Sequence, residues 1–557
     1  MCRVWGRGFF RGPFCLIAIA ELVGLQMRMV QWFRVGFLAL GMASSLAVAQ
    51  EAATPEAATE QPFDVFEYRV LGNTVLPARE IEATVYPLLG PGKRLADVQK
   101  ARDALVATYR KAGFGTVLVD IPEQTVDDGV VRLQVTEGKV GRVDVRGARY
   151  FSTREIKQNL PAVEPGSVPK LPEFQAQLAQ LGRATTDRRV TPVLKAGRAP
   201  GQVDVVLNVD DNVPFHAAVE VNDRSTADTS RTRASGTIGY DYLFGQPQSL
   251  SLQYQTAPEA PNEVQVWALT WVKRLPESGG AWAVYAIDSK SDVAAVGTLN
   301  VLGNGRIFGF RRILPGPSSA KTGLGVSLGA DYKDFKEDIR LPKNVSSVTP
   351  IRYVVSSAAV NGYVHEGPWA LDAGATLSLG LRGVVNREPD FAYKRAYGHG
   401  NFAYLRANGS LAYTLPKDFR VALRVAGQYS PQPLISNEQF SMGGADTVRG
   451  YLEAEALVDR GAVGTLELAS PAIKWFEWGR DSYALRAALF LEGGIGYLER
   501  PLPSQDAKFD LAGYGLGVSL GGGRGVEAKL DWARTLLPGS RTPEGDSRIH
   551  FSFKTGF

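Results

Sequence analysis

From residue 213 to the carboxyl terminus, apolar residues alternate with polar or small residues in long runs. The clearest runs keep one apolar parity over several positions and cover residues 324–332, 377–381, 419–425 and 514–520. Successive side chains of a β-strand point to opposite faces, so this alternation predicts strands with one apolar and one polar face. Breaks rich in Gly, Pro and Asp separate the runs, which predicts antiparallel strands joined by turns.

A soluble β-sandwich would alternate in the same way. Four features favour a transmembrane barrel: strands of about 9 to 12 residues, arginines in the middle of the polar faces, aromatic residues near strand ends, and a predicted signal peptide at the start of the chain. Closing the sheet pairs the backbone groups that an open edge would leave unsatisfied in hydrocarbon. At about 20 to 22 residues for each strand and its connection, residues 213–557 predict an antiparallel transmembrane barrel of about 16 strands.

The segment before the barrel has a different pattern. Residues 63–138 follow the order strand, helix, helix, strand, strand: an extended run over 63–71, a helix with Ile81, Val85, Leu88 and Leu89 on one face, a second helix that stops near Gly113, and two alternating runs near 117–121 and 131–135. This order predicts a small α+β module.

The pattern restarts 75 residues later, where Val70, Gly72, Arg79, Glu80 and Ile81 recur as Val145, Gly147, Arg154, Glu155 and Ile156. Helices near 153–160 and 172–182 and strands near 189–195 and 202–209 complete the second copy. The sequence therefore predicts a second α+β module over residues 139–212.

The first 49 residues predict a secretory signal, with basic residues, the apolar run 35–48 and a small-residue ending at Ala49. The signal reads well from Met27 or Met29, and the preceding residues are either an over-extended start or part of a long signal. Residues 50–62 are a linker rich in Ala, Glu, Thr and Pro. We expect an exported protein.

Composition removes several classes of function. Both cysteines, Cys2 and Cys15, precede the predicted cleavage point, so the mature chain has neither a disulfide framework nor a thiolate metal site. A formal charge of +5 from 62 basic and 57 acidic residues gives no reason to expect nucleic acid. The four histidines have no metal-ligand spacing, and the sequence contains neither a nucleophile elbow nor a phosphate loop. We therefore expect neither an enzyme nor a bound cofactor.

The architecture resembles the polypeptide-transport-associated (POTRA) modules and barrel of two-partner secretion transporters of the haemolysin secretion/activation type. The supporting motifs are Val70-Leu71-Gly72-Asn73-Thr74, Tyr109-Arg110-Lys111-Ala112-Gly113-Phe114, Pro200-Gly201-Gln202-Val203-Asp204 and, most specifically, Val448-Arg449-Gly450-Tyr451 after Met442-Gly443-Gly444. The last strand also ends with Phe551, Phe553 and Phe557 on one face, which looks like the recognition signal of the barrel-assembly machinery.

The resemblance implies that Arg449 lies at the tip of a loop folded into the barrel and meets an acidic residue of the inner wall, here Glu492. The alternation over 483–497 also places Glu492 on the lumen side, and a planar arginine fork suits a carboxylate. The family usually has Asp there. Residues 50–62 are too few for a long plug helix, so either the plug is absent or the loop carrying Arg449 does most of the occlusion.

The implied function is export of an unfolded haemolysin- or adhesin-like exoprotein, captured by the POTRA modules and moved through the barrel without ATP, in contact with outer-membrane lipids. Three alternatives stay open: a factor that assembles other barrels, a passive porin, and a binding barrel that uses large outward loops near 335–350 and 501–508. For the two charges, the simpler interpretations are an ordinary loop arginine and a generic lumen carboxylate.

Overall fold

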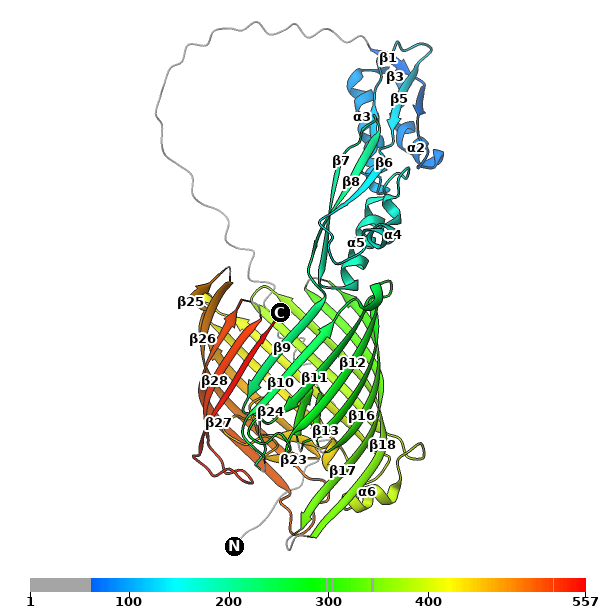
Figure 1. The fold of residues 1–557 in the computed structure, drawn as a ribbon. Coiled ribbons are helices and arrows are strands. Elements are labelled where there is room, and N and C mark those ends of the chain that lie inside the picture. Colours follow the sequence, from blue (N-terminus) through cyan, green and yellow to red (C-terminus); the bar gives the residue numbers. More distant parts are fainter. Residues whose placement is uncertain are drawn as a thin grey trace, which may run out of the picture. The chain divides into compact units, whose positions relative to one another are not determined.

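The computed structural model describes residues 62–557, apart from 228, 292, 297, 298, 303, 320, 342–344, 480 and 524. The predicted signal and all but the last residue of the predicted linker lie outside the described residues. The described chain forms two α+β modules and a β-barrel (Figure 1). None of its helices has both the length and the apolar character needed to cross a bilayer.

The first module is a three-stranded sheet covered by two helices. Its elements are β1 Phe63–Val65, β2 Glu67–Leu71, α2 Ala78–Val85, the 3-10 helix η1 Tyr86–Leu88, β3 Gly90–Lys93, α3 Leu95–Lys111, β4 Leu118–Asp120 and β5 Val130–Thr136. The central strand β5 pairs in parallel with β2 and antiparallel with β4, while β1 pairs with β3. Two details of the prediction were wrong: the run 63–71 breaks into two strands at Phe66, and Leu88 and Leu89 lie beyond the end of α2.

Apolar side chains from both helices and from β5 fill the core of this module, among them Ile81, Leu105 and Leu133. Two of the quoted motifs meet here, because the buried Tyr109 hydroxyl donates to the side-chain oxygen of Asn73 at 2.7 Å. Burial raises the pKa of the Tyr109 phenol to about 12, and the negative charge of Glu137 acts in the same direction. The motif residues thus stabilise the turn that follows β2.

The second module repeats this design. Its elements are β6 Lys139–Arg146, α4 Thr153–Gln158, the 3-10 helix η2 Pro161–Val163, α5 Leu171–Ala184, β7 Arg188–Ala196 and β8 Gln202–Asp211, with the strand order β6-β8-β7. The repeated glycines have the same local geometry: Gly72 has φ +83° and Gly147 φ +88°, and a Cβ at either would lie 2.3 Å from a carbonyl oxygen of the central strand. Only glycine fits this position without strain.

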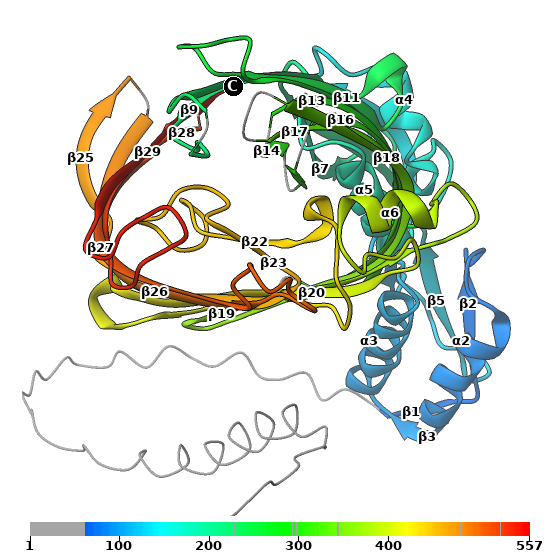
Figure 2. The same ribbon diagram turned by 90° about the horizontal axis from the view of Figure 1, so that it is seen from below.

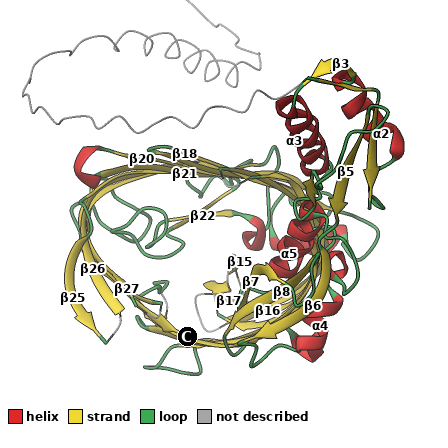
Figure 3. Cartoon of the chain, turned by 90° about the horizontal axis from the view of Figure 1, so that it is seen from above, coloured by secondary structure: helices red, strands yellow, loops and turns green. Residues whose placement is uncertain are grey.

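Sixteen strands close the barrel in the described part of the chain when β24 and β25 are counted as one strand interrupted at Pro471, since both pair with β26. Strand β29 pairs with β9 to complete the ring, which Figure 3 shows from above. The bounds are β9 Phe215–Asn222, β10 Arg233–Tyr240, β11 Gln248–Thr256, β12 Gln265–Leu275, β13 Gly280–Lys290, β16 Gly305–Ser318, β17 Thr322–Leu341, β18 Val345–Glu366, β19 Trp369–Gly380, β20 Ala403–Thr414, β21 Arg420–Tyr429, β24 Arg460–Ala469, β25 Ile473–Trp478, β26 Asp481–Tyr497, β27 Lys508–Gly522, β28 Val526–Thr535 and β29 Ser547–Gly556.

Smaller elements lie in the connections between the barrel strands. They are η3 Leu243–Gly245, the paired β14 Val293–Val296 and β15 Leu299–Leu302, α6 Glu388–Lys394, η4 Pro416–Asp418, η5 Ser436–Glu438, β22 Phe440–Met442 and β23 Ala456–Val458. The last three belong to one long connection between β21 and β24.

The predicted apolar parity faces outward along the barrel wall. Leu377 and Leu516 are 44% and 50% exposed, whereas their polar neighbour Ser378 is 5% exposed and faces the interior. One expectation was wrong: β17 and β18 are 20 and 22 residues long and extend through the predicted outward loop 335–350. The antiparallel backbone pairing of β17 and β18 continues from the pair Phe335–Ile351 to the pair Leu341–Val345, so this stretch is a strand hairpin.

Candidate functional site

The connection between β21 and β24, residues 430–459, folds into the barrel, and we call it the pore loop. Its strands β22 and β23 form a short antiparallel hairpin within the ring of barrel strands (Figure 2). Gly443 and Gly444 end the first arm with φ of +95° and +109°. A Cβ at Gly443 would lie 2.6 Å from Cβ of Glu455, so the two arms pack too closely for a larger residue here.

The Arg449 side chain at the tip of the pore loop is 2% exposed and is surrounded by acidic groups of the barrel wall. Its Nε and Nη2 donate to Oε1 of Glu492 at 2.9 and 2.7 Å, and its backbone N–H donates to Oε2 of the same carboxylate at 2.6 Å. Its Nη1 donates to Oδ2 of Asp531 at 2.9 Å. The guanidinium carbon lies 3.2 Å from the ring centroid of Phe490, which adds a cation–π contact.

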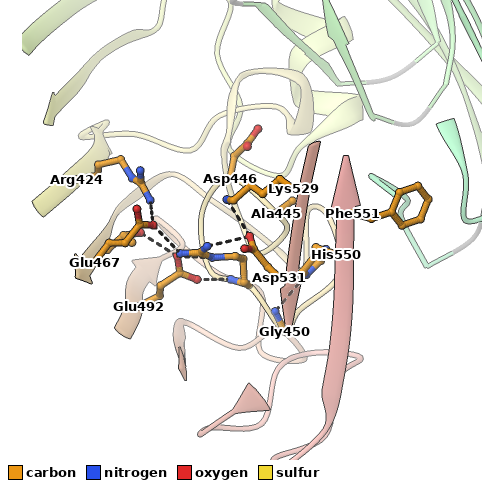
Figure 4. Close-up of polar contacts among 12 residues, drawn as sticks. Arg424, Ala445, Asp446, Gly450, Glu467, Glu492, Lys529, Asp531, His550 and Phe551 are labelled. Carbon is orange, nitrogen blue, oxygen red and sulfur yellow. Dashed lines mark hydrogen bonds and ion pairs between the residues drawn. The ribbon is translucent and has the colours of Figure 1, made fainter. Parts of the chain in front are cut away.

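The charges around Arg449 balance within one cluster (Figure 4). Glu467 lies 3.6 Å from Arg449 and accepts a hydrogen bond from Arg424 at 2.9 Å, while Lys529 lies 2.8 Å from Asp531. With Glu492, the cluster contains three carboxylates and three cations from the pore loop, β21, β24, β26 and β28. A buried charge is tolerated when it is paired and hydrogen-bonded, so removal of one member leaves a costly imbalance.

The other motif residues fix the tip by packing and by backbone contacts. Val448 and Tyr451 are fully buried, and the Tyr451 hydroxyl donates to the carbonyls of Ala512 and Leu537 at 2.9 and 2.7 Å. The backbone N–H of Gly450 donates to Nε2 of His550 at 3.3 Å. All four residues of the motif therefore help to hold the tip of the pore loop against the barrel wall.

Glu492 is the partner that the sequence indicated for Arg449, and the structure brings the two together. Asp531 and Glu467 were missed. Both alternate with outward residues of their strands, so the sequence could have predicted that they face the lumen. Their nearness to Arg449, however, depends on the pairing of β21, β24, β26, β27 and β28. That register is set by hydrogen bonds between distant segments rather than by local sequence.

The three aromatic residues predicted as an assembly signal lie on one parity of the last strand or just after it. Phe553 is 45% and Phe557 68% exposed, and the Phe557 ring lies 6.0 Å from that of Phe215, between centroids. The backbone N–H of Phe551 donates to Asp223 at 2.9 Å. The exposed rings lie on, or directly after, the strand that closes the barrel.

One histidine lies among carboxylates despite the absence of any metal-ligand spacing in the sequence. Ligand atoms of Asp187, His216 and Asp241 lie within 4.8 Å of one another. Asp187 also accepts a hydrogen bond from Thr185, and Asp241 pairs with Arg274 at 3.3 Å. We assign this group as an ion-pair network.

A cavity of about 920 Å³ with polar and apolar lining residues lies inside the barrel against the first strands. Its lining includes Glu220, Asn222, Arg224, Gln253 and Lys554. These residues project from β9, β11 and β29 or follow β9 directly, whereas the contacts of Arg449 lie on β24, β26 and β28. This cavity therefore offers charged and amide side chains next to apolar ones, on a part of the wall away from the contacts of Arg449.

Two family models match the chain. The model of the haemolysin secretion/activation protein ShlB/FhaC/HecB matches residues 201–520, and that of the ShlB-type POTRA domain matches residues 63–138. Similar proteins include the outer membrane transporter CdiB of Escherichia coli O6:K15:H31 (strain 536 / UPEC), 23% identical over 84% of this chain and 78% of that protein. The heme/hemopexin transporter protein HuxB of Haemophilus influenzae (strain ATCC 51907 / DSM 11121 / KW20 / Rd) is 20% identical over 79% of this chain and 78% of that protein.

Solved structures share the fold. CdiB from Escherichia coli superposes with a TM-score of 0.61 at 18% identity and covers 90% of this chain and 93% of that one. BamA from Haemophilus ducreyi lacking POTRA domains 1–3 gives a TM-score of 0.53 at 13% identity over 89% of this chain and 100% of that one. At these identities the likeness concerns the fold alone.

Proposed function

This chain belongs to the haemolysin secretion/activation family, and we propose that it captures one kind of unfolded exoprotein with its POTRA modules and exports it through its barrel. It is an outer-membrane transporter of two-partner secretion and not an enzyme, and POTRA modules of this family lie in the periplasm. The finer steps below are our proposal. The observation that supports them most directly is a pore loop seated in the lumen by a buried arginine.

Capture uses the open edges of the module sheets. In the first module β2 and β4 are edge strands on either side of β5, and in the second β6 and β7 flank β8. Leu71 on β2 and Leu118 on β4 are 43% and 62% exposed. An unfolded chain can add as a strand to such an edge through backbone hydrogen bonds, while exposed apolar side chains contribute affinity.

Passage requires the tip of the pore loop to leave its seat. Arg449, Glu492 and Asp531 hold the tip on the β26–β28 wall, and its release would connect the cavity inside the barrel with the outside. The driving force is folding of the exoprotein after it emerges, so no ATP is used. A haemolysin-like passenger agrees with the description of the matching family model, and we extend the proposal to adhesin-like exoproteins.

The outer face and the last strand support two further contacts of this proposal. The exposed leucines of the wall suit lipid chains, and Phe551, Phe553 and Phe557 would be read by the barrel-assembly machinery during insertion. Substitution of Phe557 by Ser should then lower the amount of assembled barrel without changing the secretion per assembled barrel.

The deciding experiment compares the culture medium and the outer-membrane fraction of cells with and without this chain by quantitative mass spectrometry. Loss of one or a few large secreted proteins, with other barrels unchanged, supports a dedicated exporter. A general fall in outer-membrane barrels would instead identify an assembly factor, and unchanged protein amounts in both fractions would favour a porin.

A further inference from the structure

We propose that Glu438 is a second anchor of the pore loop, which holds the base of the loop to a different part of the wall from the tip. Glu438 belongs to η5, directly before β22, and is 1% exposed. The strands that receive it are β17, β18 and β20, none of which contacts Arg449 through a hydrogen bond or ion pair among the described residues. The loop would thus be fixed at both ends, by separate groups.

Three donors on three strands converge on the Glu438 carboxylate. Oε1 accepts from Nζ of Lys333 at 2.6 Å and from the hydroxyl of Tyr353 at 2.5 Å, and Oε2 accepts from the hydroxyl of Tyr404 at 2.7 Å. Lys333 and Tyr353 are paired across β17 and β18, so both reach the same side of the loop. A surface carboxylate rarely gains this many partners, and each of them is itself buried or nearly so.

The backbone of the same turn is held as well. Nη2 of Arg406 donates to the carbonyls of Glu438 and Gln439 at 3.1 and 3.3 Å, and Nε2 of Gln428 donates to the Glu438 carbonyl at 3.1 Å. Arg406 is in turn oriented by Gln428, which accepts from its Nε at 2.6 Å. The barrel wall therefore forms hydrogen bonds with both the side chain of Glu438 and the main chain of η5.

Asp459 joins the two arms of the loop at this base. Its Oδ1 accepts from the backbone of Leu434 at 2.9 Å and from Nε2 of Gln439 at 3.0 Å, and its Oδ2 pairs with Arg395 at 3.2 Å. Asp459 ends the second arm, whereas Leu434 and Gln439 belong to the first. Anchoring Glu438 therefore anchors the whole base.

A loop fixed twice moves differently from one fixed once. When the tip leaves Glu492, the Glu438 anchor keeps the base on the β17–β20 wall, so the hairpin swings about η5 instead of leaving the lumen. For transport, this means that a route opens on the β26–β28 side and can close again. This consequence rests on the function proposed above. The anchor itself does not.

The test follows nitroxide mobility at two positions of the full chain in detergent or lipid, with Cys2→Ser and Cys15→Ser as the background. The reporters are Ser441→Cys in β22, near the base, and Ala445→Cys, near the tip. We release the base with Glu438→Ala, Lys333→Met and Arg406→Met together, because this change removes the carboxylate and the two cations that hold η5 and leaves no lone buried charge. We release the tip with Arg449→Ala.

Release of the base should shift the spectrum at 441 to a mobile component and leave that at 445 nearly unchanged, while release of the tip should do the reverse. The matched control is Arg188→Met with Glu155→Gln, a part-buried pair 3.3 Å apart in the second α+β module that has no hydrogen bond or ion pair to the pore loop among the described residues; it should leave both spectra unchanged. An immobile label at 441 after base release, or mobility at both positions after tip release, would overturn the second anchor. These spectra are independent of secretion, so failure of the transport proposal would appear separately in the culture medium.

Discussion

In the two POTRA modules apolar side chains point inward and charges point outward, whereas the barrel wall has the opposite arrangement. Leu105 of the first module is fully buried, but Leu516 of the barrel is 50% exposed, and the largest buried polar side chains include Arg449. The modules fold by removing apolar surface from water, while the barrel presents that surface to lipid and pairs its charges inside. The modules and the barrel therefore bury opposite kinds of side chain, because the modules are surrounded by water and the outer wall of the barrel by lipid.

The largest expected effect comes from breaking the interior charge cluster. Arg449→Ala leaves Glu492 and Asp531 without their shared cation, and loss of one partner from a buried ion pair typically costs about 3 to 5 kcal/mol. We expect secretion of the exoprotein to fall by about tenfold or more, since each 1.4 kcal/mol corresponds to a factor of ten, with the barrel still assembled. Immunoblots of the medium and heat-shift of the barrel on gels measure the two quantities.

The matched control is Arg486→Ala on β26, a lumen arginine that lines the cavities beside the cluster and has no hydrogen bond or ion pair to the pore loop among the described residues. It should leave secretion near the parent level. Equal loss with both variants would mean that lumen charge in general, and not the latch, limits export.

The next prediction compares the loss of stability caused by the same Leu→Ala truncation in the core of a module and on the lipid-facing wall of the barrel. Leu105→Ala in the module core removes buried atoms and leaves a cavity, at about 2 to 5 kcal/mol. Leu516→Ala on the lipid-facing wall should cost less, because lipid chains fill the vacated space and no cavity forms. Hydrogen exchange of the full chain, followed by mass spectrometry of peptides from each region, would compare them; similar destabilisation at both sites would contradict the inverted arrangement.

A charge placed on either face of one strand sharpens the comparison within the barrel. Leu516→Arg puts a cation toward lipid and should destabilise the barrel by about 2 to 4 kcal/mol if it lies near the bilayer midplane. Ser519→Arg, on the lumen side of the same strand β27, should have little effect because its side chain meets water. Denaturant titration of barrels refolded in lipid vesicles measures both, and a reversed order would mean that the assigned faces are wrong.

The smallest effect tests the internal repeat. Gly72→Ala and Gly147→Ala force a Cβ against a carbonyl oxygen in a left-handed backbone, and we expect about 1 to 3 kcal/mol from each. Gly166→Ala is the control, since its φ is +91° but nothing lies within 4 Å of the added atom. Local hydrogen exchange should rise equally in the two modules and less for the control; a large difference between the two repeats would contradict their equivalence.

Local pattern alone determined the modules, the barrel and the inward side of β26. Strand and helix periods depend only on neighbouring residues, which is why the repeat of residues 63–138 in 139–212 and the inward position of Glu492 could be predicted. The motif around Arg449 marked the tip of the loop by resemblance. None of these steps needed to know which strands pair.

Only the tertiary structure decided which groups meet inside the barrel. Asp531, Glu467 and the donors of Glu438 come from strands far apart in the sequence, and their meeting depends on strand register and on how the pore loop crosses the lumen. The hairpin of β17 and β18 likewise extends through residues expected to form a loop, because its pairing follows the backbone ladder and not the hydrophobic pattern. Local sequence specifies the direction of a side chain, whereas its partner follows from hydrogen bonds summed around the whole ring.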